Sequence, residues 1–230
     1  MGVRSGVPTP RSLATRARLI GAAERLFAER SIEAVSLNEI SKAAGQRNSS
    51  VCQYHFRNKQ GLLRAILDKH IPGIATAREV LLEQLRRSGR PPGLRALVRA
   101  FVQPVAAKLH DADGGREFVR INAQLIALYT LSVQGVPVSP LKLGLHADRF
   151  FEELRRVLRA AGIPEAVVQQ RLMLAAVLVF HGLDDHVRML DAASRRAATR
   201  GTTLFIANLE DSLVALLSAP MPAARRALNR

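Results

Sequence analysis

The spacing of apolar residues predicts helices along the whole chain, and no stretch keeps the period-two alternation of a β-strand. From residue 15 to about residue 30 the apolar positions share one helix face, with Thr15 placed as the N-cap. A second short helix follows Ser36, because Ser36 and Glu39 have the spacing of a capping box. Gly45 is placed to end that helix in a left-handed conformation.

Two further helices follow a polar turn. Residues 51–56 form the third helix, and Asn58 is placed to cap a fourth that begins at Lys59. Pro72 and Gly73 are expected to kink or end that helix, since proline removes a backbone donor.

Beyond residue 73, proline and glycine divide the chain into a series of helices, which the pattern predicts at 74–88, 94–109, 116–132, 140–161, 164–190 and 202–218. The predicted fold class is therefore all-α. The predicted organisation is a flexible basic arm at 1–12, a three-helix domain at 13–70, a helical domain at 71–219 and a basic tail at 220–230.

Composition narrows the classes of protein that fit. The chain has 230 residues, 48% of them hydrophobic, which is enough to bury a core without covalent staples. Its single cysteine, Cys52, excludes a disulfide framework or a cysteine-rich zinc module. No uninterrupted apolar run approaches the roughly 18 residues of a membrane span, and the N-terminus lacks an apolar signal core. The expected location is the cytoplasm, with no membrane partner.

Charge adds a preference for a partner. There are 34 Lys and Arg against 19 Asp and Glu, a net charge of +15. The first 70 residues carry 12 of the basic and 5 of the acidic side chains, so the surplus is densest there. A surplus of this size favours nucleic acid or an anionic membrane surface.

The first three helices have the plan of a helix-turn-helix unit, in which the third helix enters the major groove of DNA. Its exposed side chains must then be polar, and the predicted set is Arg47, Asn48, Ser49, Ser50 and Gln53. Arginine pairs with guanine, and asparagine or glutamine with adenine, by double hydrogen bonds.

An ordered set of motif positions runs through residues 15–67. It comprises Thr15 to Ile20, Ala22-Ala23, Leu26 to Glu29, Glu33 to Leu37, Glu39-Ile40, Ala43 to Gly45, Tyr54 to Phe56, Lys59 and Leu62-Leu63. This set strongly resembles the N-terminal domain of TetR-family transcriptional regulators. The resemblance implies an N-terminal DNA-binding domain and a C-terminal helical domain that binds an effector and dimerises. It also implies an Ω-shaped homodimer, a repressor released when a small apolar or amphipathic effector binds, on a palindromic operator in double-stranded DNA.

Two positions depart from the common family pattern. Ser31 stands where the family usually has glycine after the first helix. The stretch from Gly45 to Phe56 is one residue longer than usual, which resembles a subset with an Arg-Asn-Ser-type turn. The candidate DNA-contact residues are Thr15, Arg16, Ser36, Arg47, Asn48, Ser49, Ser50, Gln53, Tyr54, His55 and Lys59. For Tyr54 and His55, packing and phosphate contact stay open as alternatives.

The C-terminal part offers candidates for a dimer interface and an effector pocket. Two helices near the C-terminus are more apolar than one subunit is expected to cover, and the resemblance implies that they pair with their twofold copies. The predicted interface residues are Val168, Leu172, Val179, Phe205, Leu209, Leu213 and Leu216, and a purely internal core is the alternative. The pocket candidates are Phe101, Phe118, Asn122, Leu125, Tyr129, Phe150, Phe151, Leu154 and His181, with Gln124 as a further polar anchor. A plain core is the alternative for most of these, because aromatic spacing does not separate a lining from a packing face.

Catalysis has little support in the sequence. His181 and Asp185 lie four residues apart, a spacing that metal ligands use, which keeps a metal-dependent enzyme open as an alternative. No glycine-rich phosphate loop, nucleophile elbow or zincin motif occurs. The prediction is a non-enzymatic protein without metal or cofactor. The other alternative is a dimeric ligand-binding protein that does not read DNA sequence.

Overall fold

The computed structural model describes residues 9–87, 92–131, 149–192 and 195–221, apart from the side chains of 128–131, 192 and 195–200. Every element in these ranges is helical, which confirms the predicted all-α class.

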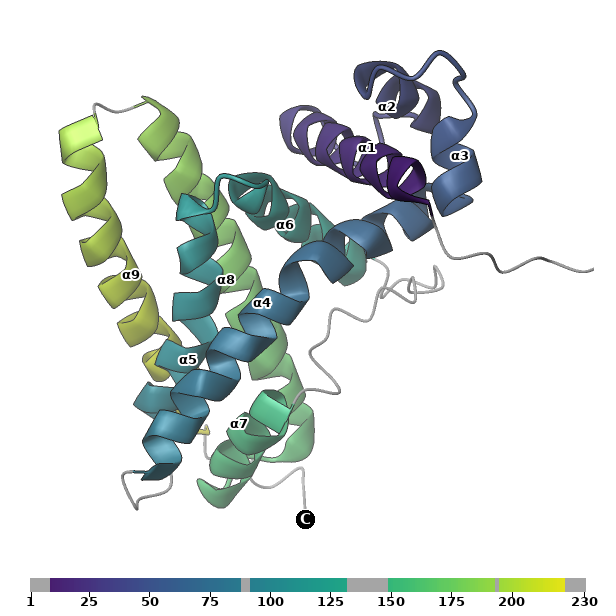
Figure 1. Cartoon of the computed structure of the whole chain (residues 1–230). Coiled ribbons are helices and arrows are strands. Elements are labelled where there is room, and N and C mark those ends of the chain that lie inside the picture. The colour runs from purple at the N-terminus through teal and green to yellow at the C-terminus, as the bar shows by residue number, and fades with distance from the viewer. Residues whose placement is uncertain (1–8, 88–91, 132–148, 193–194, 222–230) are drawn as a thin grey trace, which may run out of the picture.

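Three helices form an N-terminal unit at one end of a long fourth helix (Figure 1). They are α1 (Pro10–Glu29), α2 (Leu37–Ala43) and α3 (Val51–Phe56), and the long helix is α4 (Lys59–Arg87). Apolar side chains at helical spacing hold the unit together, and Leu19, Phe27, Ile40, Cys52 and Phe56 are all buried. The predicted helix-turn-helix domain is confirmed.

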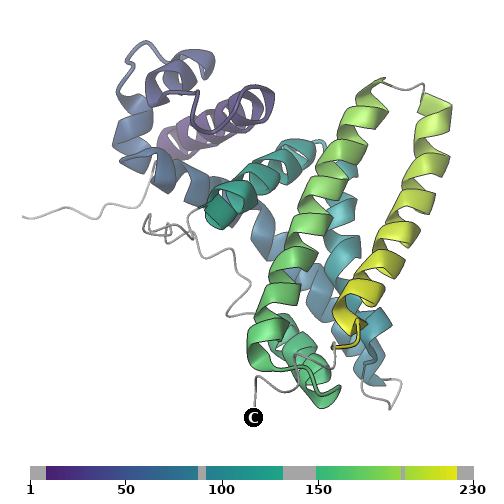
Figure 2. The same cartoon turned by 180° about the vertical axis from the view of Figure 1, so that it is seen from behind.

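The rest of the chain forms a larger helical body. Its elements are α5 (Leu94–Ala106), the 3-10 turn η1 (Ala107–His110), α6 (Gly115–Leu131), α7 (Arg149–Ala160), α8 (Glu165–Ala192) and α9 (Arg195–Ser218). Helices α8 and α9 lie side by side along one edge of the molecule in both views (Figures 1 and 2). At the end of this pair, Arg171 of α8 donates hydrogen bonds to the carbonyls of Leu217 (2.7 Å) and Ala219 (2.5 Å), which satisfies the C-terminus of α9.

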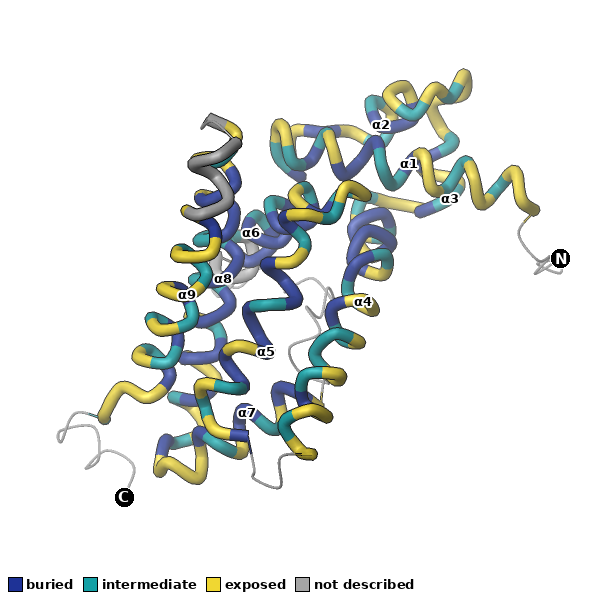
Figure 3. The backbone as a smooth tube through the Cα atoms, turned by 60° about the vertical axis from the view of Figure 1, so that its left-hand side comes forward, coloured by how far each residue is buried: buried dark blue, intermediate teal, exposed yellow. Residues whose placement is uncertain are grey.

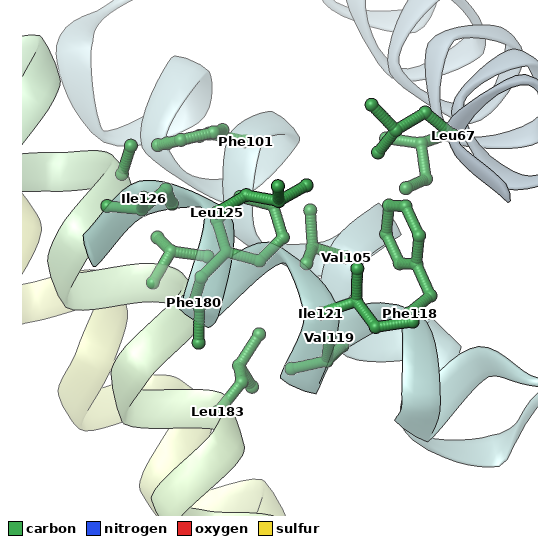
Figure 4. Close-up of a cluster of buried hydrophobic side chains, with 14 of the residues drawn as sticks. Leu67, Phe101, Val105, Phe118, Val119, Ile121, Leu125, Ile126, Phe180 and Leu183 are labelled. Atoms are coloured by element: carbon green, nitrogen blue, oxygen red, sulfur yellow. The ribbon is translucent and has the colours of Figure 1, made fainter. Parts of the chain in front are cut away.

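Side chains from four helices fill the core between the two parts. Figure 4 shows Phe118, Ile121 and Leu125 of α6 lying among Phe101 of α5, Phe180 of α8 and their neighbours, with Leu67 of α4 at one side. Helix α4 therefore touches both the N-terminal unit and the body.

The first helix begins earlier than the pattern predicts. Thr9, and not Thr15, is the N-cap of α1, because its hydroxyl accepts a hydrogen bond from the amide of Ser12 at 3.3 Å. Pro10 stands in the first helical turn, where a missing N–H costs nothing. The prediction of a flexible arm is thus wrong for residues 10–12, and residues 1–8 lie outside the described part of the chain.

The predicted break at Pro72 and Gly73 is also wrong. Helix α4 continues through both residues, and His70, Ile74 and Leu82 are buried along it. Pro72 is exposed, and so is Asp68, whose carbonyl has no helical donor because Pro72 lacks an N–H. Packing of the apolar side outweighs that loss, so the predicted boundary between residues 70 and 71 falls inside one helix.

Helix α8 is long and apolar enough, by length and composition, to cross a membrane. This is weak evidence, because the core helix of a water-soluble protein passes the same test. In the described structure α8 packs on α6 and α9, and 44% of its apolar window is buried (Figure 3).

Candidate nucleic-acid interface

Helix α2 is capped as the sequence predicts. The Ser36 hydroxyl accepts from the Glu39 amide at 3.2 Å, and the Glu39 carboxylate accepts from the Ser36 amide at 2.8 Å. The bond from the Ser36 backbone, followed by the bond from Arg30, lowers the pKa of Glu39 to about 2. Ser36 is exposed, so its hydroxyl lies at the surface while it caps the helix. A phosphate contact from this residue remains a prediction.

A polar turn connects α2 to α3. Gly45 has a φ of 69°, the left-handed conformation predicted for it. Asn48 accepts a hydrogen bond from the Ser50 amide at 2.9 Å through its side-chain oxygen. The buried Ser41 hydroxyl accepts from the Cys52 amide at 3.1 Å, which anchors the start of α3 to α2. The turn is therefore held from both ends.

The candidate base-reading side chains lie in the turn before α3 and on α3 itself, and we call this exposed set the α3 surface. Its members are Arg47, Asn48, Ser49, Ser50, Gln53 and Tyr54, all of them exposed. Tyr54 is 84% exposed, which leaves its ring and hydroxyl free of the core. Cys52 and Phe56, on the opposite side of α3, are buried. A short helix with one buried and one exposed polar side is the geometry needed to enter a major groove.

Arg16 and His55 brace α3 from behind. The Arg16 guanidinium lies 4.4 Å from the centre of the Phe56 ring and donates a hydrogen bond to the His55 carbonyl at 3.4 Å. Burial, followed by the charge of Arg16, lowers the pKa of His55, which favours the neutral imidazole. Thr15 accepts from Arg18 at 3.4 Å within α1. These contacts tie α1 to α3, and DNA contact by Thr15, Arg16 and His55 stays a prediction.

Lys59 also has a contact within the protein. Its ammonium donates to the carbonyls of Ile32 (2.7 Å) and Glu33 (3.1 Å), in the connection between α1 and α2. A cation at a helix N-terminus is unfavourable towards the helix dipole, and these two carbonyls compensate for that within the protein. A phosphate contact remains a prediction.

Arg57, directly after α3, is a feature that the sequence analysis missed. It has φ 66° and ψ −52°, and is the one residue other than glycine with a positive φ among the described residues. The Asn58 amide donates to the Phe56 carbonyl at 2.8 Å, which closes a three-residue γ-turn around Arg57. Such a conformation costs an arginine about 1–3 kcal/mol. No pattern around this position signals a positive φ.

The junction between α3 and α4 is tight. Asn58 caps α4 as predicted, since its side-chain oxygen accepts from the Gly61 amide at 2.9 Å. A Cβ on Gly61 would lie 2.0 Å from the Phe56 carbonyl oxygen, so only glycine fits there without movement. The orientation of α3 relative to α4 thus depends on the absence of a side chain at Gly61.

The thiol of Cys52 is inert by geometry. It is buried in the N-terminal core, and burial raises its pKa to about 11. The thiolate, which is the reactive form, is therefore scarce at neutral pH. Cys52 behaves as a small apolar core residue.

A partly buried ionic cluster joins the N-terminal unit to the body, and the sequence did not predict it. We call Glu24, Lys69, His70 and Asp113 the junction cluster. Glu24 of α1 is 2% exposed and accepts from Lys69 at 2.8 Å and from the imidazole of His70 at 2.7 Å. Lys69 also donates to Asp113 at 2.8 Å, in the connection before α6. Burial and the two carboxylates act in opposite directions on Lys69, and the net effect raises its pKa.

A second contact across the junction involves Gln124 of α6. Its side chain donates to the Phe27 carbonyl at 2.8 Å and accepts from the Ile32 amide at 2.8 Å. The expectation that Gln124 anchors an effector is therefore wrong, because both ends of its amide bind the end of α1 and the turn after it.

The pocket candidates lie in the core of the body. Most of them are buried, namely Phe101, Phe118, Asn122, Leu125, Phe150, Phe151 and Leu154. Asn122 donates to the Phe118 carbonyl of its own helix at 2.8 Å. His181 is half-buried, and the Tyr129 side chain lies outside the described residues. The guanidinium of Arg78 lies 5.1–5.4 Å from the ring centres of Phe101, Phe150 and Phe151. A role for these residues in effector binding stays a prediction.

The interface prediction is wrong for most of its residues. Val168, Leu172, Val179, Leu209 and Leu213 are buried within a single subunit, so they face its own core. Phe205 and Leu216 are half-buried. Phe205 stacks on the His186 ring at 4.3 Å within the subunit. The large apolar side chains that α8 and α9 leave exposed are Leu174, Met189 and Leu204. The apolar sequence of a helix indicates how much of its surface must be buried, but it does not identify the segment that buries it.

The candidate metal pair is not brought into a ligand cluster. Asp185 is exposed and His181 half-buried, and the described part of the chain holds no group of three His, Cys, Asp or Glu side chains able to bind a metal ion. The adjacent Asp184 pairs with Arg188 at 2.8 Å and with Arg120 at 3.3 Å. Charge pairing therefore accounts for this region of α8.

Comparison with known proteins points to the N-terminal unit. Residues 19–66 match the family model described as bacterial regulatory proteins, tetR family. No curated protein sequence matches the chain. Among solved structures the chain is similar to Salmonella enterica GusR, with 21% sequence identity and a TM-score of 0.45, over 93% of this chain and 100% of that one.

Proposed function

We propose, on the premise that residues 19–66 are a tetR-family DNA-binding domain, that this protein is a dimeric repressor that an effector releases from its operator. The DNA-binding helix-turn-helix domain places the protein among transcriptional regulators. The observation that carries the proposal is the α3 surface, where exposed polar side chains lie in the turn before α3 and on the exposed side of α3, whose other side is buried. We expect the α3 surface to enter the major groove of a palindromic operator. The protein is expected to act in the cytoplasm.

The test of base reading is a comparison of two arginines. Arg47→Ala should reduce the preference for operator over a scrambled duplex by about tenfold or more, because one bidentate base contact contributes about 1–3 kcal/mol of discrimination. Arg87→Ala is the matched control, since it removes the same charge at the far end of α4. The measurement is a titration of labelled DNA from upstream of the protein's own gene, beside a scrambled duplex of equal length, near physiological salt.

The two possible failures have different meanings. An Arg47→Ala protein that keeps its full preference shows that another part of the α3 surface reads the bases. A wild-type protein that binds both duplexes equally calls for genome-wide site selection. If that selection also yields no preferred site, the alternative of a ligand-binding protein that does not read sequence replaces the proposal.

The dimer is proposed to form through α8 and α9, and two exposed apolar side chains support this arrangement. Leu174 of α8 is 53% exposed and Leu204 of α9 is 72% exposed. The two helices are neighbours at one edge of the subunit (Figure 3). Exposed large apolar side chains of this kind mark association surfaces. A twofold axis along this edge would present two copies of α3 to one face of DNA, about 34–36 Å apart for half-sites one turn apart.

Leu174→Glu is therefore expected to shift the protein towards monomer and to weaken operator binding at least tenfold at nanomolar protein, because a charge placed in an apolar interface loses its hydration. Val80→Glu is the control, since Val80 of α4 is 52% exposed but lies on another helix. Sedimentation equilibrium measures both variants. An unchanged dimer in Leu174→Glu would place the interface elsewhere.

The effector is proposed to be a small apolar or amphipathic molecule bound in the body. The buried aromatic side chains of α5, α6 and α7, with Arg78 beside three phenylalanine rings, support this class. Helix α4 connects this region to the N-terminal unit, so a change in its position would reach the α3 surface. A compound of this class that lowers operator affinity in the same titration would identify the effector.

A further inference from the structure

We propose that Arg57 is a DNA-backbone contact that holds the end of each recognition helix against a phosphate. The proposal rests on the DNA-binding function proposed above, and names a residue that none of the candidate contacts includes. Three observations carry it, namely the position of Arg57, the absence of a competing partner for its charge, and its backbone conformation.

The position of Arg57 extends the α3 surface. Its amide donates to the Gln53 carbonyl at 2.8 Å, so its Cα lies one helical turn beyond Gln53. Gln53, Tyr54 and Arg57 are all exposed. Arg57 therefore stands directly after the last turn of α3, one turn beyond a member of the α3 surface, which is the surface proposed to approach DNA.

The charge of Arg57 is available to a ligand. The neighbouring cations Arg16 and Lys59 direct their N–H groups to carbonyls within the protein. Within the ranges that the structure describes, the guanidinium of Arg57 has no such hydrogen bond and no ion pair. An exposed arginine beside a recognition helix is an electrostatic footprint of nucleic-acid binding.

The strained backbone conformation of Arg57 points to a functional role for its side chain. Glycine adopts a positive φ without steric cost, so glycine would suit this turn better than arginine. The surrounding hydrogen bonds impose the conformation, since the Phe56 carbonyl accepts from Asn58 within the γ-turn. A strained residue that the fold over-determines is a pointer to function.

The chemistry favours a phosphate over a base. Arg57 lies past the end of the helix, where side chains lie nearer the edge of a groove than its floor. Guanidinium and phosphate form paired, charge-assisted hydrogen bonds. Such a contact positions the protein and is indifferent to sequence.

Three variants of the full-length protein separate charge from strain. Arg57→Gly removes both the charge and the strain, Arg57→Gln removes the charge alone, and Arg57→Lys retains both. We expect Arg57→Gly and Arg57→Gln to bind operator and scrambled duplex about tenfold more weakly, with the slope of log K against log salt reduced by about one per subunit. Arg57→Lys should keep most of the affinity. Arg57→Gly should also raise the melting temperature by about 2–4 °C.

The combination of weaker DNA binding and a more stable fold is the result that a merely structural arginine would not produce. Affinity within about twofold of wild type in Arg57→Gln, at an unchanged salt slope, overturns the proposal. A loss confined to the operator also overturns it, because that outcome means base reading. If the wild-type protein binds neither duplex, the proposed function fails first, which is distinguishable from failure of Arg57 alone.

Discussion

Replacement of Glu24 by leucine should lower the free energy of unfolding by about 3 kcal/mol, because removal of one partner from a buried ionic group leaves the others uncompensated. Glu24 is 2% exposed and is the shared acceptor for Lys69 and His70. After the substitution His70 keeps its burial but loses its carboxylate, and Lys69 keeps only the exposed Asp113. Urea unfolding followed by circular dichroism measures the change.

Glu29→Leu is the matched control on the same helix. Glu29 is exposed, so we expect its substitution to change stability by no more than about 0.5 kcal/mol. A Glu24→Leu protein that is as stable as this control would mean that the junction cluster contributes nothing to the fold. A weaker operator affinity in Glu24→Leu alone would show, in addition, that the cluster sets the position of α1 against α4.

Gly61→Ala should have the second large effect. The added Cβ would lie 2.0 Å from the Phe56 carbonyl oxygen, a backbone atom that also accepts from Asn58. Helix α4 or the end of α3 must move, and overpacking of this kind costs about 1–3 kcal/mol and occasionally more. Since α3 leads directly into α4, we also expect operator affinity to fall about tenfold or more.

Gly21→Ala supplies the control for this substitution. Gly21 lies inside α1 with no atom within 4 Å of an added Cβ, so alanine should stabilise the helix by about 0.5–1 kcal/mol. The two variants carry the same chemical change with opposite expected signs. Thermal unfolding and the operator titration test both, and a Gly61→Ala protein as stable and as active as wild type would refute the tight junction.

The sequence predicted helix caps and turns correctly where residues close in the chain determine the structure. The Ser36–Glu39 capping box, the left-handed Gly45 and the Asn58 cap all formed as predicted, because each depends on residues within a few positions. The order of the first three helices followed from apolar spacing for the same reason. Helix ends were predicted less accurately, since Thr9 caps α1 where the sequence analysis placed Thr15.

Packing between distant segments reversed several other expectations. Helix α4 runs through Pro72 because its buried side binds both parts of the molecule. Leu172 and Leu213 face the core of their own subunit, and not a partner, because α5 and α6 cover the apolar sides of α8 and α9. Gln124 binds backbone groups of the N-terminal unit. None of these three features is determined by residues close in the chain.

The sequence by itself determined the helical class, the helix-turn-helix unit and the set of polar side chains on the α3 surface. Periodicity and capping are properties of short segments, so they survive without knowledge of the fold. Tertiary structure alone decided that Glu24 meets Lys69 and His70 and that a γ-turn holds Arg57. The Glu24 contacts arise only when segments far apart in the chain meet in space. The strain at Arg57 arises only when the junction between α3 and α4 imposes a tight turn.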